Sequence, residues 1–206
     1  MEICFVTAYF FYYKRKDPLE FALFIFLLNA FNLADGLDGL LISLFITGAL
    51  TAFLITGEKF LLLCIFAAGV MLLINFPPAK MYLGDSGALF LGYTAFHFIY
   101  TGIAGRGFLY GALGISVIFL YPFLDTSWAV VRRLASRKPL FGKDDLHIHH
   151  RFRKKYGKTA ALGILFLFNL VNNVIFFTVL RQLPLKYSWF YFIILMMNAV
   201  LLRFLW

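Results

Sequence analysis

Long apolar stretches separated by short polar turns dominate the hydrophobic pattern of this chain. They cover residues 3–13, 19–34, 40–56, 60–76, 88–103, 108–131, 161–180 and 187–206. Most of them approach the roughly 20 residues that an α-helix needs to cross a bilayer. The pattern predicts an all-α fold, a polytopic transmembrane bundle of about seven to eight membrane helices. We expect it to form a single integral membrane domain over residues 1–206.

The break between stretches 19–34 and 40–56 carries the first candidate chemistry. It reads Asn-Leu-Ala-Asp-Gly-Leu-Asp-Gly-Leu over residues 32–40, so that Asn32, Asp35 and Asp38 stand beside Gly36 and Gly39. A charged side chain at mid-bilayer costs roughly 2.5–3.5 kcal/mol on insertion scales. These aspartates are therefore expected at a membrane surface or in a wet cavity, where they form a site.

A second polar cluster follows the stretch 60–76, where Pro77 and Pro78 stop the helix. It contains Lys80, Tyr82 and Asp85. Because two predicted spans separate this cluster from the first one, both are expected on the same face of the membrane.

The only long polar segment in the sequence is a basic loop over residues 132–158. It holds more than half of the 19 lysines and arginines, together with His147, His149, His150 and Arg151. By the positive-inside rule this loop is cytoplasmic, and counting spans backwards puts the two aspartate clusters on the cytoplasmic face as well. Asp125 lies shortly before the loop, so four polar clusters are expected to converge there.

The composition agrees with a membrane protein. The chain is 62% hydrophobic and 14% charged, with a mean hydropathy of +0.84, which excludes an ordinary soluble domain. Its formal net charge is +9. In a membrane protein such an excess orients loops and attracts anionic lipids or anionic substrates, whereas nucleic acid is a poor interpretation.

Carboxylates that are spaced apart in sequence suit magnesium, which takes one or two of them and completes its octahedron with water and substrate phosphate. The pattern therefore implies a phosphate-bearing substrate, whose remaining charge the basic loop would neutralise.

Each cluster also has a simpler interpretation. The Asp-Gly and Gly-Asp-Ser-Gly sequences are common in turns and helix caps, and a basic loop is often only an orientation signal and lipid anchor. His147, His149 and His150 could bind zinc, although no second cysteine or histidine cluster matches them. Asp125 is either paired with Arg132 or Arg133 at the membrane edge or part of the site. The joint appearance of the clusters on one face favours a site.

The four motifs resemble, in order and spacing, the polyprenyl-phosphate N-acetylhexosamine-1-phosphate transferases. They are Asn32-x-x-Asp35-Gly36-x-Asp38-Gly39-Leu40, residues 78–87 around Asp85, Pro122-x-x-Asp125-Thr126 with two arginines, and Asp144-Asp145-x-His147-x-His149-His150-Arg151. The peptidoglycan branch, MraY, has a histidine triplet at the last motif. The element around Asp125 is closer to the WecA/TagO branch, which favours an N-acetylhexosamine donor over the muramyl pentapeptide.

The resemblance implies a reaction and a role for each motif. A polyprenyl (undecaprenyl) phosphate attacks the β-phosphorus of a UDP-N-acetylhexosamine and releases UMP, as the first membrane step of cell-envelope polysaccharide synthesis. Magnesium is implied as the cofactor, with manganese as an alternative. The implied metal ligands are Asp85, Asp35 and Asn32; the implied catalytic residues are Asp35, Asp38, Asp85, His147, His149 and His150; and the implied substrate-binding residues are Asn32, Gly36, Lys80, Tyr82, Asp125 and Arg151.

The resemblance covers residues from about 18 to 153 and departs from the family at the N-terminus. Family members carry further helices before the position of Met1, with an adjacent aspartate pair and a lysine. We therefore expect a fragment or a reduced form that needs a partner chain or forms a homo-oligomer, and the 206 residues alone are expected to be weakly active or inactive.

Other classes of function are less consistent with the sequence. A non-catalytic relative that binds the UDP-sugar together with another chain is the main alternative. A transporter should place ionisable residues mid-span, whereas the aspartates here fall at span ends. The CDP-alcohol phosphotransferases need an Ala-Arg after their first Asp-Gly, which Asp38-Gly39-Leu40 lacks.

Overall fold

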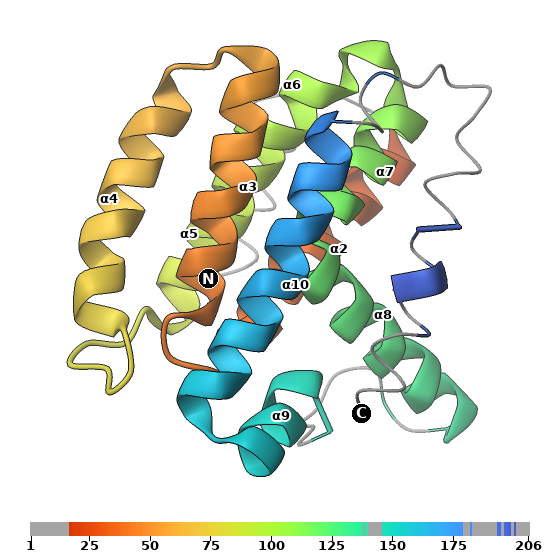
Figure 1. Cartoon of the computed structure of the whole chain (residues 1–206). Coiled ribbons are helices and arrows are strands. Elements are labelled where there is room, and N and C mark those ends of the chain that lie inside the picture. Colours follow the sequence, from red (N-terminus) through yellow and green to blue (C-terminus); the bar gives the residue numbers. More distant parts are fainter. Residues whose placement is uncertain are drawn as a thin grey trace.

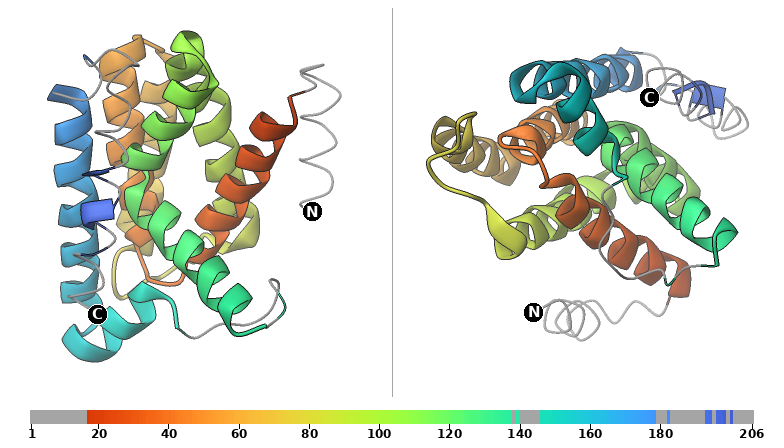
Figure 2. Two further views of the ribbon diagram at one scale, coloured as in Figure 1. Left: turned by 90° about the vertical axis from the view of Figure 1, so that its right-hand side faces the viewer. Right: turned by 90° about the horizontal axis from the view of Figure 1, so that it is seen from below.

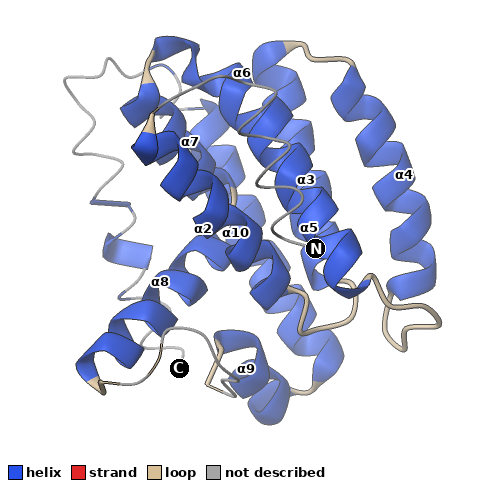
Figure 3. Cartoon of the chain, turned by 180° about the vertical axis from the view of Figure 1, so that it is seen from behind, coloured by secondary structure: helices blue, strands red, loops and turns tan. Residues whose placement is uncertain are grey.

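The structure, a computed structural model, describes residues 17–137, 139, 146–178, 182, 193–194, 196–198 and 200. Every regular element in these residues is a helix, which confirms the all-α prediction (Figures 1 and 3). The longer helices are α2 (Pro18–Ala34), α3 (Leu40–Thr56), α4 (Phe60–Asn75), α5 (Gly84–Thr94), α7 (Phe108–Ile118), α8 (Leu120–Ala135), α9 (Ile148–Tyr156) and α10 (Lys158–Thr178). Between α5 and α7 lie the π-helix η1 (Ala95–Tyr100), α6 (Thr101–Ile103) and the 3-10 helix η2 (Ala104–Arg106).

Helices α3 and α2 organise the bundle. Helix α3 packs against α4 on one side and α10 on the other, while α2 packs against α5 and α8 (Figure 2). Aromatic side chains fill the contact regions: Phe24 meets Phe96 at 5.0 Å between ring centroids, and Phe31 meets Phe119 at 4.9 Å. These helices are apolar on most sides, as expected for helices that bury one face and leave another to lipid.

Local sequence signals set the ends of α2 and α3. Asp17 caps α2 by accepting a hydrogen bond from the backbone N–H of Leu19 at 2.9 Å, and Pro18 occupies the first helical position. Gly39 and Gly57 flank α3 with φ of 78° and 72°, a left-handed conformation that favours glycine. Gly39 therefore lies just before the start of α3 and Gly57 just after its end, where the sequence pattern predicts turns.

The stretch predicted as one span over residues 108–131 is broken into two helices in the structure. Helices α7 and α8 meet at an angle of 99° at Phe119. Two asparagines of α10 bind the backbone freed by this break: Asn169 accepts from the N–H of Tyr121 at 3.4 Å and donates to the carbonyl of Ile118 at 3.0 Å, and Asn173 donates to the same carbonyl at 2.9 Å. A broken helix is tolerated in an apolar bundle when side chains bind its exposed polar groups in this way.

Replacing Asn169 with leucine is expected to destabilise the fold by about 1–3 kcal/mol, because the N–H of Tyr121 is left buried and unpaired. Asn172→Leu is the matched control, since Asn172 is also buried but bonds the carbonyl of Phe168 in its own helix and the side chain of Asn198. Denaturant titration in detergent measures both variants. Equal losses of stability in the two variants would show that the hydrogen bonds of Asn169 at the α7–α8 break stabilise the fold no more than those of Asn172 do.

Helix lengths support only part of the predicted membrane topology. Within the described residues, α10 is long and apolar enough to cross a membrane, and the bent α7–α8 pair passes the same test together. Helices α2, α3 and α4 are apolar but have 16 or 17 residues. The predicted stretch 3–13 and most of 187–206 lie outside the described residues, and the basic loop 132–158 proves to contain helix α9.

Candidate active site

Four segments far apart in sequence meet at one end of the bundle, the lower end in Figure 1. They are the turn between α2 and α3 (residues 35–39, the aspartate loop), the turn between α4 and α5, the start of α9 with its preceding residues, and the start of α10. The hydrogen bonds and ion pairs described below connect them. The predicted convergence of the motifs is therefore confirmed for the described residues.

Asp38 ties the aspartate loop to two of these segments. Its Oδ2 accepts a hydrogen bond from the backbone N–H of Ala79 at 3.4 Å and lies 3.3 Å from the ammonium of Lys158 at the start of α10. Lys158 is exposed, so this ion pair adds little stability by itself. These two contacts fix the side chain of Asp38 and connect the aspartate loop to the turn between α4 and α5 and to the start of α10.

Asn75, which the sequence analysis did not identify, joins the first two motifs. Its buried side chain accepts from the N–H of Gly39 at 2.7 Å and donates to the carbonyl of Met81 at 2.7 Å. An amide is the side chain that can accept from one loop and donate to the other. A polar residue as the last residue of an otherwise apolar helix was the signal that could have revealed it.

Asp35 faces the second motif across the loop. The pKa of Asp35 is raised to about 7, first by burial and then by the nearby carboxylates of Asp85 and Asp38, against the opposing effect of a backbone hydrogen bond from Gly84. One turn earlier, Oδ1 of Asn32 is buried and has no hydrogen-bond partner in the described residues. The carboxylate of Asp35 and the unpaired amide oxygen of Asn32 thus lie one helical turn apart.

Asp125 contacts the histidine cluster in the structure. Its Oδ2 lies 2.8 Å from Nδ1 of His147, and its Oδ1 accepts from the backbone N–H of Ile148 at 2.8 Å. Asp125 therefore acts as a cap at the start of α9 and orients the ring of His147.

His149 lies at the contact between α9 and the aspartate loop. Its Nδ1 is 2.9 Å from the hydroxyl of Tyr121, and its Nε2 points at Gly36, where an added Cβ would lie only 2.0 Å away. Burial lowers the pKa of His149 to about 4; Asp125 opposes this shift, and nearby cationic groups such as Arg153 reinforce it. His149 is consequently a neutral imidazole at physiological pH.

The remaining predicted site residues lie at the same end but make fewer contacts. Lys80 and Tyr82 are exposed on the turn between α4 and α5, and Tyr82 is 73% exposed. His150 and Arg151 are half-buried in the first turn of α9, with the ring of His150 4.2 Å from that of His149 between centroids. An aromatic ring and a cation are thus available beside the aspartates.

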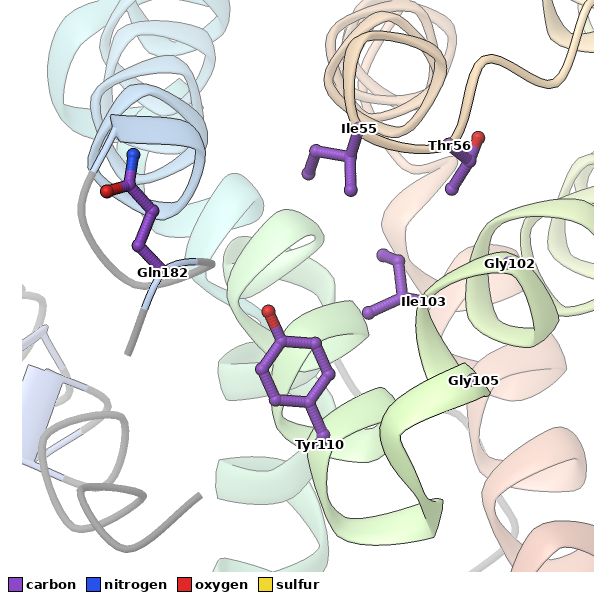
Figure 4. Close-up of a pocket in the computed structure, with 7 residues that line it drawn as sticks. All are labelled: Ile55, Thr56, Gly102, Ile103, Gly105, Tyr110 and Gln182. Atoms are coloured by element: carbon purple, nitrogen blue, oxygen red, sulfur yellow. The ribbon is translucent and has the colours of Figure 1, made fainter. Parts of the chain in front are cut away.

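A cavity of about 390 Å³ lies at the opposite end of the bundle, near Thr56, Tyr110 and Gln182 (Figure 4). In the part of the chain that the structure describes, its lining residues are uncharged. The ionisable groups described above lie at the polar end, which is the candidate site.

Comparison with known proteins shows which family and which relatives this chain resembles. Residues 3–103 match the glycosyl transferase family 4. The chain is 39% identical over 165 residues to the undecaprenyl-phosphate alpha-N-acetylglucosaminyl 1-phosphate transferase of Thermotoga maritima, covering 78% of this chain and 52% of the relative. It is 32% identical over 158 residues to a probable undecaprenyl-phosphate N-acetylglucosaminyl 1-phosphate transferase of Bacillus subtilis, covering 73% and 44%. A phospho-N-acetylmuramoyl-pentapeptide-transferase of Petrotoga mobilis is 29% identical over 154 residues, covering 71% and 46%. The chain thus spans about half the length of these curated relatives.

Proposed function

We propose that this chain, which belongs to glycosyl transferase family 4, the family of the polyprenyl-phosphate N-acetylhexosamine-1-phosphate transferases, transfers N-acetylglucosamine 1-phosphate from UDP-N-acetylglucosamine to a polyprenyl phosphate. UMP is the second product. Two of the relatives are named for this transfer to undecaprenyl phosphate. Because the chain spans about half their length, the activity and its substrates are proposals for this protein.

The observation that carries the proposal is the meeting of Asp35, Asp85 and His149 at one end of the bundle. Asp35 is close enough to Asp85 for the second carboxylate to raise its pKa, and His149 touches the same loop at Gly36. Phosphoryl transfer needs little covalent chemistry from the protein, which mainly positions groups and stabilises charge. Carboxylates for a metal and N–H donors for phosphate oxygens are the required parts.

Magnesium suits these residues, with manganese as an alternative. Asp35 and Asp85 would supply carboxylate oxygens, and the unpaired Oδ1 of Asn32 would supply a third oxygen. Among the residues that the structure describes, no group of three histidine, cysteine, aspartate or glutamate side chains could hold a metal by itself. Magnesium usually takes one or two carboxylates and completes its shell with water and phosphates. When bound, the ion would neutralise the developing charge on the transferred phosphoryl group.

The remaining residues would bind the donor. Tyr82 offers an exposed aromatic face to the uracil, and Lys80 with Arg151 offers cations to the phosphates. Asp38 would act by holding the loop that carries Asp35, given its contacts with Ala79 and Lys158. The lipid phosphate would reach the site from the bilayer at the cytoplasmic membrane surface, an orientation supported by the basic residues at this end of the bundle.

A second candidate function uses the same polar end of the bundle. The chain would bind the UDP-sugar without consuming it and act with another chain or a second copy of itself. Titration of the chain in detergent with UDP-N-acetylglucosamine and magnesium tests the part common to both candidates. Binding that is lost in Asp85→Asn supports them, and a chain that binds no UDP-sugar contradicts both.

Magnesium should bind more tightly as the pH rises towards 7, because Asp35 must release a proton to become a ligand. The dissociation constant should fall about tenfold per pH unit below this pKa and level off above it. Calorimetric titrations from about pH 6 to about pH 8 measure the slope. Asp35→Asn should lose it, whereas Glu58→Gln, which changes an exposed carboxylate beyond the other end of α3, should keep it. Magnesium affinity that is constant over this range would refute the assignment of Asp35.

A further inference from the structure

Tyr121 is a buried side chain with no role in the proposed function so far. It lies in the first turn of α8 and is fully buried, and its hydroxyl is 2.9 Å from Nδ1 of His149. Four residues later in the same helix, Asp125 contacts Nδ1 of His147 at 2.8 Å. Residues four apart share one face of a helix, so Tyr121 and Asp125 lie on one face of α8. Each of them contacts the Nδ1 atom of a histidine ring, His149 and His147 respectively.

The direction of the hydrogen bond between Tyr121 and His149 follows from the groups around it. Both oxygens of Asp125 are already engaged, by the ring of His147 and by a backbone N–H. Nδ1 of His149 is the ring nitrogen that contacts the Tyr121 hydroxyl, and the backbone N–H of His149 also donates to this hydroxyl. If Nδ1 carried the proton, the hydroxyl would accept it and its own proton would stay unpaired in a buried site. The hydroxyl therefore donates, and Nδ1 accepts.

The opposite nitrogen of His149 is then an N–H donor. A neutral imidazole carries one proton, so acceptance at Nδ1 leaves that proton on Nε2. Nε2 is buried and has no hydrogen-bond partner in the described part of the chain. It points at Gly36 in the aspartate loop. A buried donor without an acceptor is rare in proteins and is explained by a ligand that brings the acceptor.

We propose that Tyr121 is a positioning residue that fixes His149 in the tautomer with its proton on Nε2, so that the ring offers an N–H donor to an anion bound at the aspartate loop. The identity of the anion rests on the proposed function, in which it is the pyrophosphate of the UDP-sugar. Asp125 orients His147 in the opposite sense, because it accepts from Nδ1 and leaves Nε2 of a neutral His147 ring as an acceptor. The two rings lie nearly parallel, 5.7 Å apart between centroids, and present unlike groups.

Nitrogen-15 spectra of protein labelled at histidine test the proposal, since they distinguish a protonated from an unprotonated ring nitrogen. The signals of His149 are assigned by their loss in His149→Gln. In the unmodified chain Nδ1 should be unprotonated and Nε2 protonated. Tyr121→Phe should shift part or all of the population to the Nδ1-protonated form, because Oδ2 of Asp125, 3.9 Å from this nitrogen, becomes its nearest acceptor.

Tyr100→Phe is the matched control. Tyr100 is equally buried, and its hydroxyl donates to a carboxylate oxygen of Glu20 at 3.0 Å rather than to His147, His149 or His150. It should leave the nitrogen signals of His149 unchanged. A protonated Nδ1 in the unmodified chain, or a Tyr121→Phe spectrum identical to that of the unmodified chain, would overturn the proposal. If Tyr121→Phe does not fold, the spectrum of the unmodified chain alone decides.

A binding measurement separates this proposal from the proposed function. Tyr121→Phe should weaken UDP-N-acetylglucosamine binding by about tenfold to a hundredfold, the loss expected for a hydrogen bond to a charged group, and Tyr100→Phe should not. If the tautomer is as proposed but no UDP-sugar binds to the unmodified chain, the proposed function fails while the positioning role stands. If the UDP-sugar binds but the tautomer does not depend on Tyr121, the positioning role fails alone.

Discussion

Replacing Gly36 with alanine is expected to abolish UDP-sugar binding and to destabilise the chain by about 1–3 kcal/mol. The new Cβ would lie 2.0 Å from Nε2 of His149 and 2.8 Å from two ring carbons. The ring is held by Tyr121 and by the rest of α9, so either the aspartate loop or the helix must move. The φ of Gly36 is not in the left-handed region, and the expected effect therefore comes from lack of space alone.

Gly69→Ala is the control for this substitution. Gly69 lies within α4, and an added Cβ would meet nothing within 4 Å. Its stability should stay the same or rise slightly, because alanine restricts the unfolded chain. The double variant Gly36→Ala with His149→Ala should recover most of the stability lost in Gly36→Ala. Additive losses in the double variant would contradict a direct contact between the loop and this histidine.

Asp85→Asn is expected to reduce magnesium-dependent turnover by at least about a hundredfold. The change removes one charge and leaves the size of the side chain unchanged. It should also bring the pKa of Asp35 down towards its ordinary value, because Asp85 is one of the groups that raise it. Carbon-13 spectra of the Asp35 carboxyl, recorded over a pH range in the absence of magnesium, measure this second effect.

Glu58→Gln controls for the loss of a carboxylate. Glu58 lies in the turn after α3, beyond the end of that helix opposite the aspartate loop, and its Oε1 accepts from the backbone N–H of Phe60. Turnover should be unchanged in this variant. The free energy of unfolding of Asp85→Asn is compared with the free energy that corresponds to its loss of turnover. If the two losses were equal, the effect of the substitution would be structural and the metal role would be refuted.

The sequence predicted the helical class and most helix ends, because the signals for both are local. Apolar stretches bounded by Pro18, Gly39 and Gly57 mark helices whatever surrounds them. The break at Phe119 was missed because its cause is not local. The polar groups that it exposes are bound by Asn169 and Asn173, which come about 50 residues later and read as ordinary interruptions of an apolar span.

The residues of the candidate site could likewise be predicted only where their signal in the sequence is local. The aspartates and histidines could be recognised because ionisable residues are costly in apolar surroundings and stand out in such a sequence. Their partners could not. Asn75 joins two loops through its amide, and Tyr121 contacts His149 across 28 residues, yet both side chains are uncharged and stand out less in the sequence than the aspartates do. The pairing of Asp125 with His147 also depends on the fold, since arginines lie closer to it in sequence.

Magnesium-dependent transfer of labelled N-acetylglucosamine 1-phosphate to undecaprenyl phosphate, measured with this chain in detergent beside Asp85→Asn, tests the central claim most directly. The proposed function predicts labelled lipid and UMP in equal amounts, both lost without magnesium and in the variant. Turnover that continues at the unmodified rate in Asp85→Asn or without magnesium, or a chain that neither binds nor consumes the UDP-sugar, would contradict it.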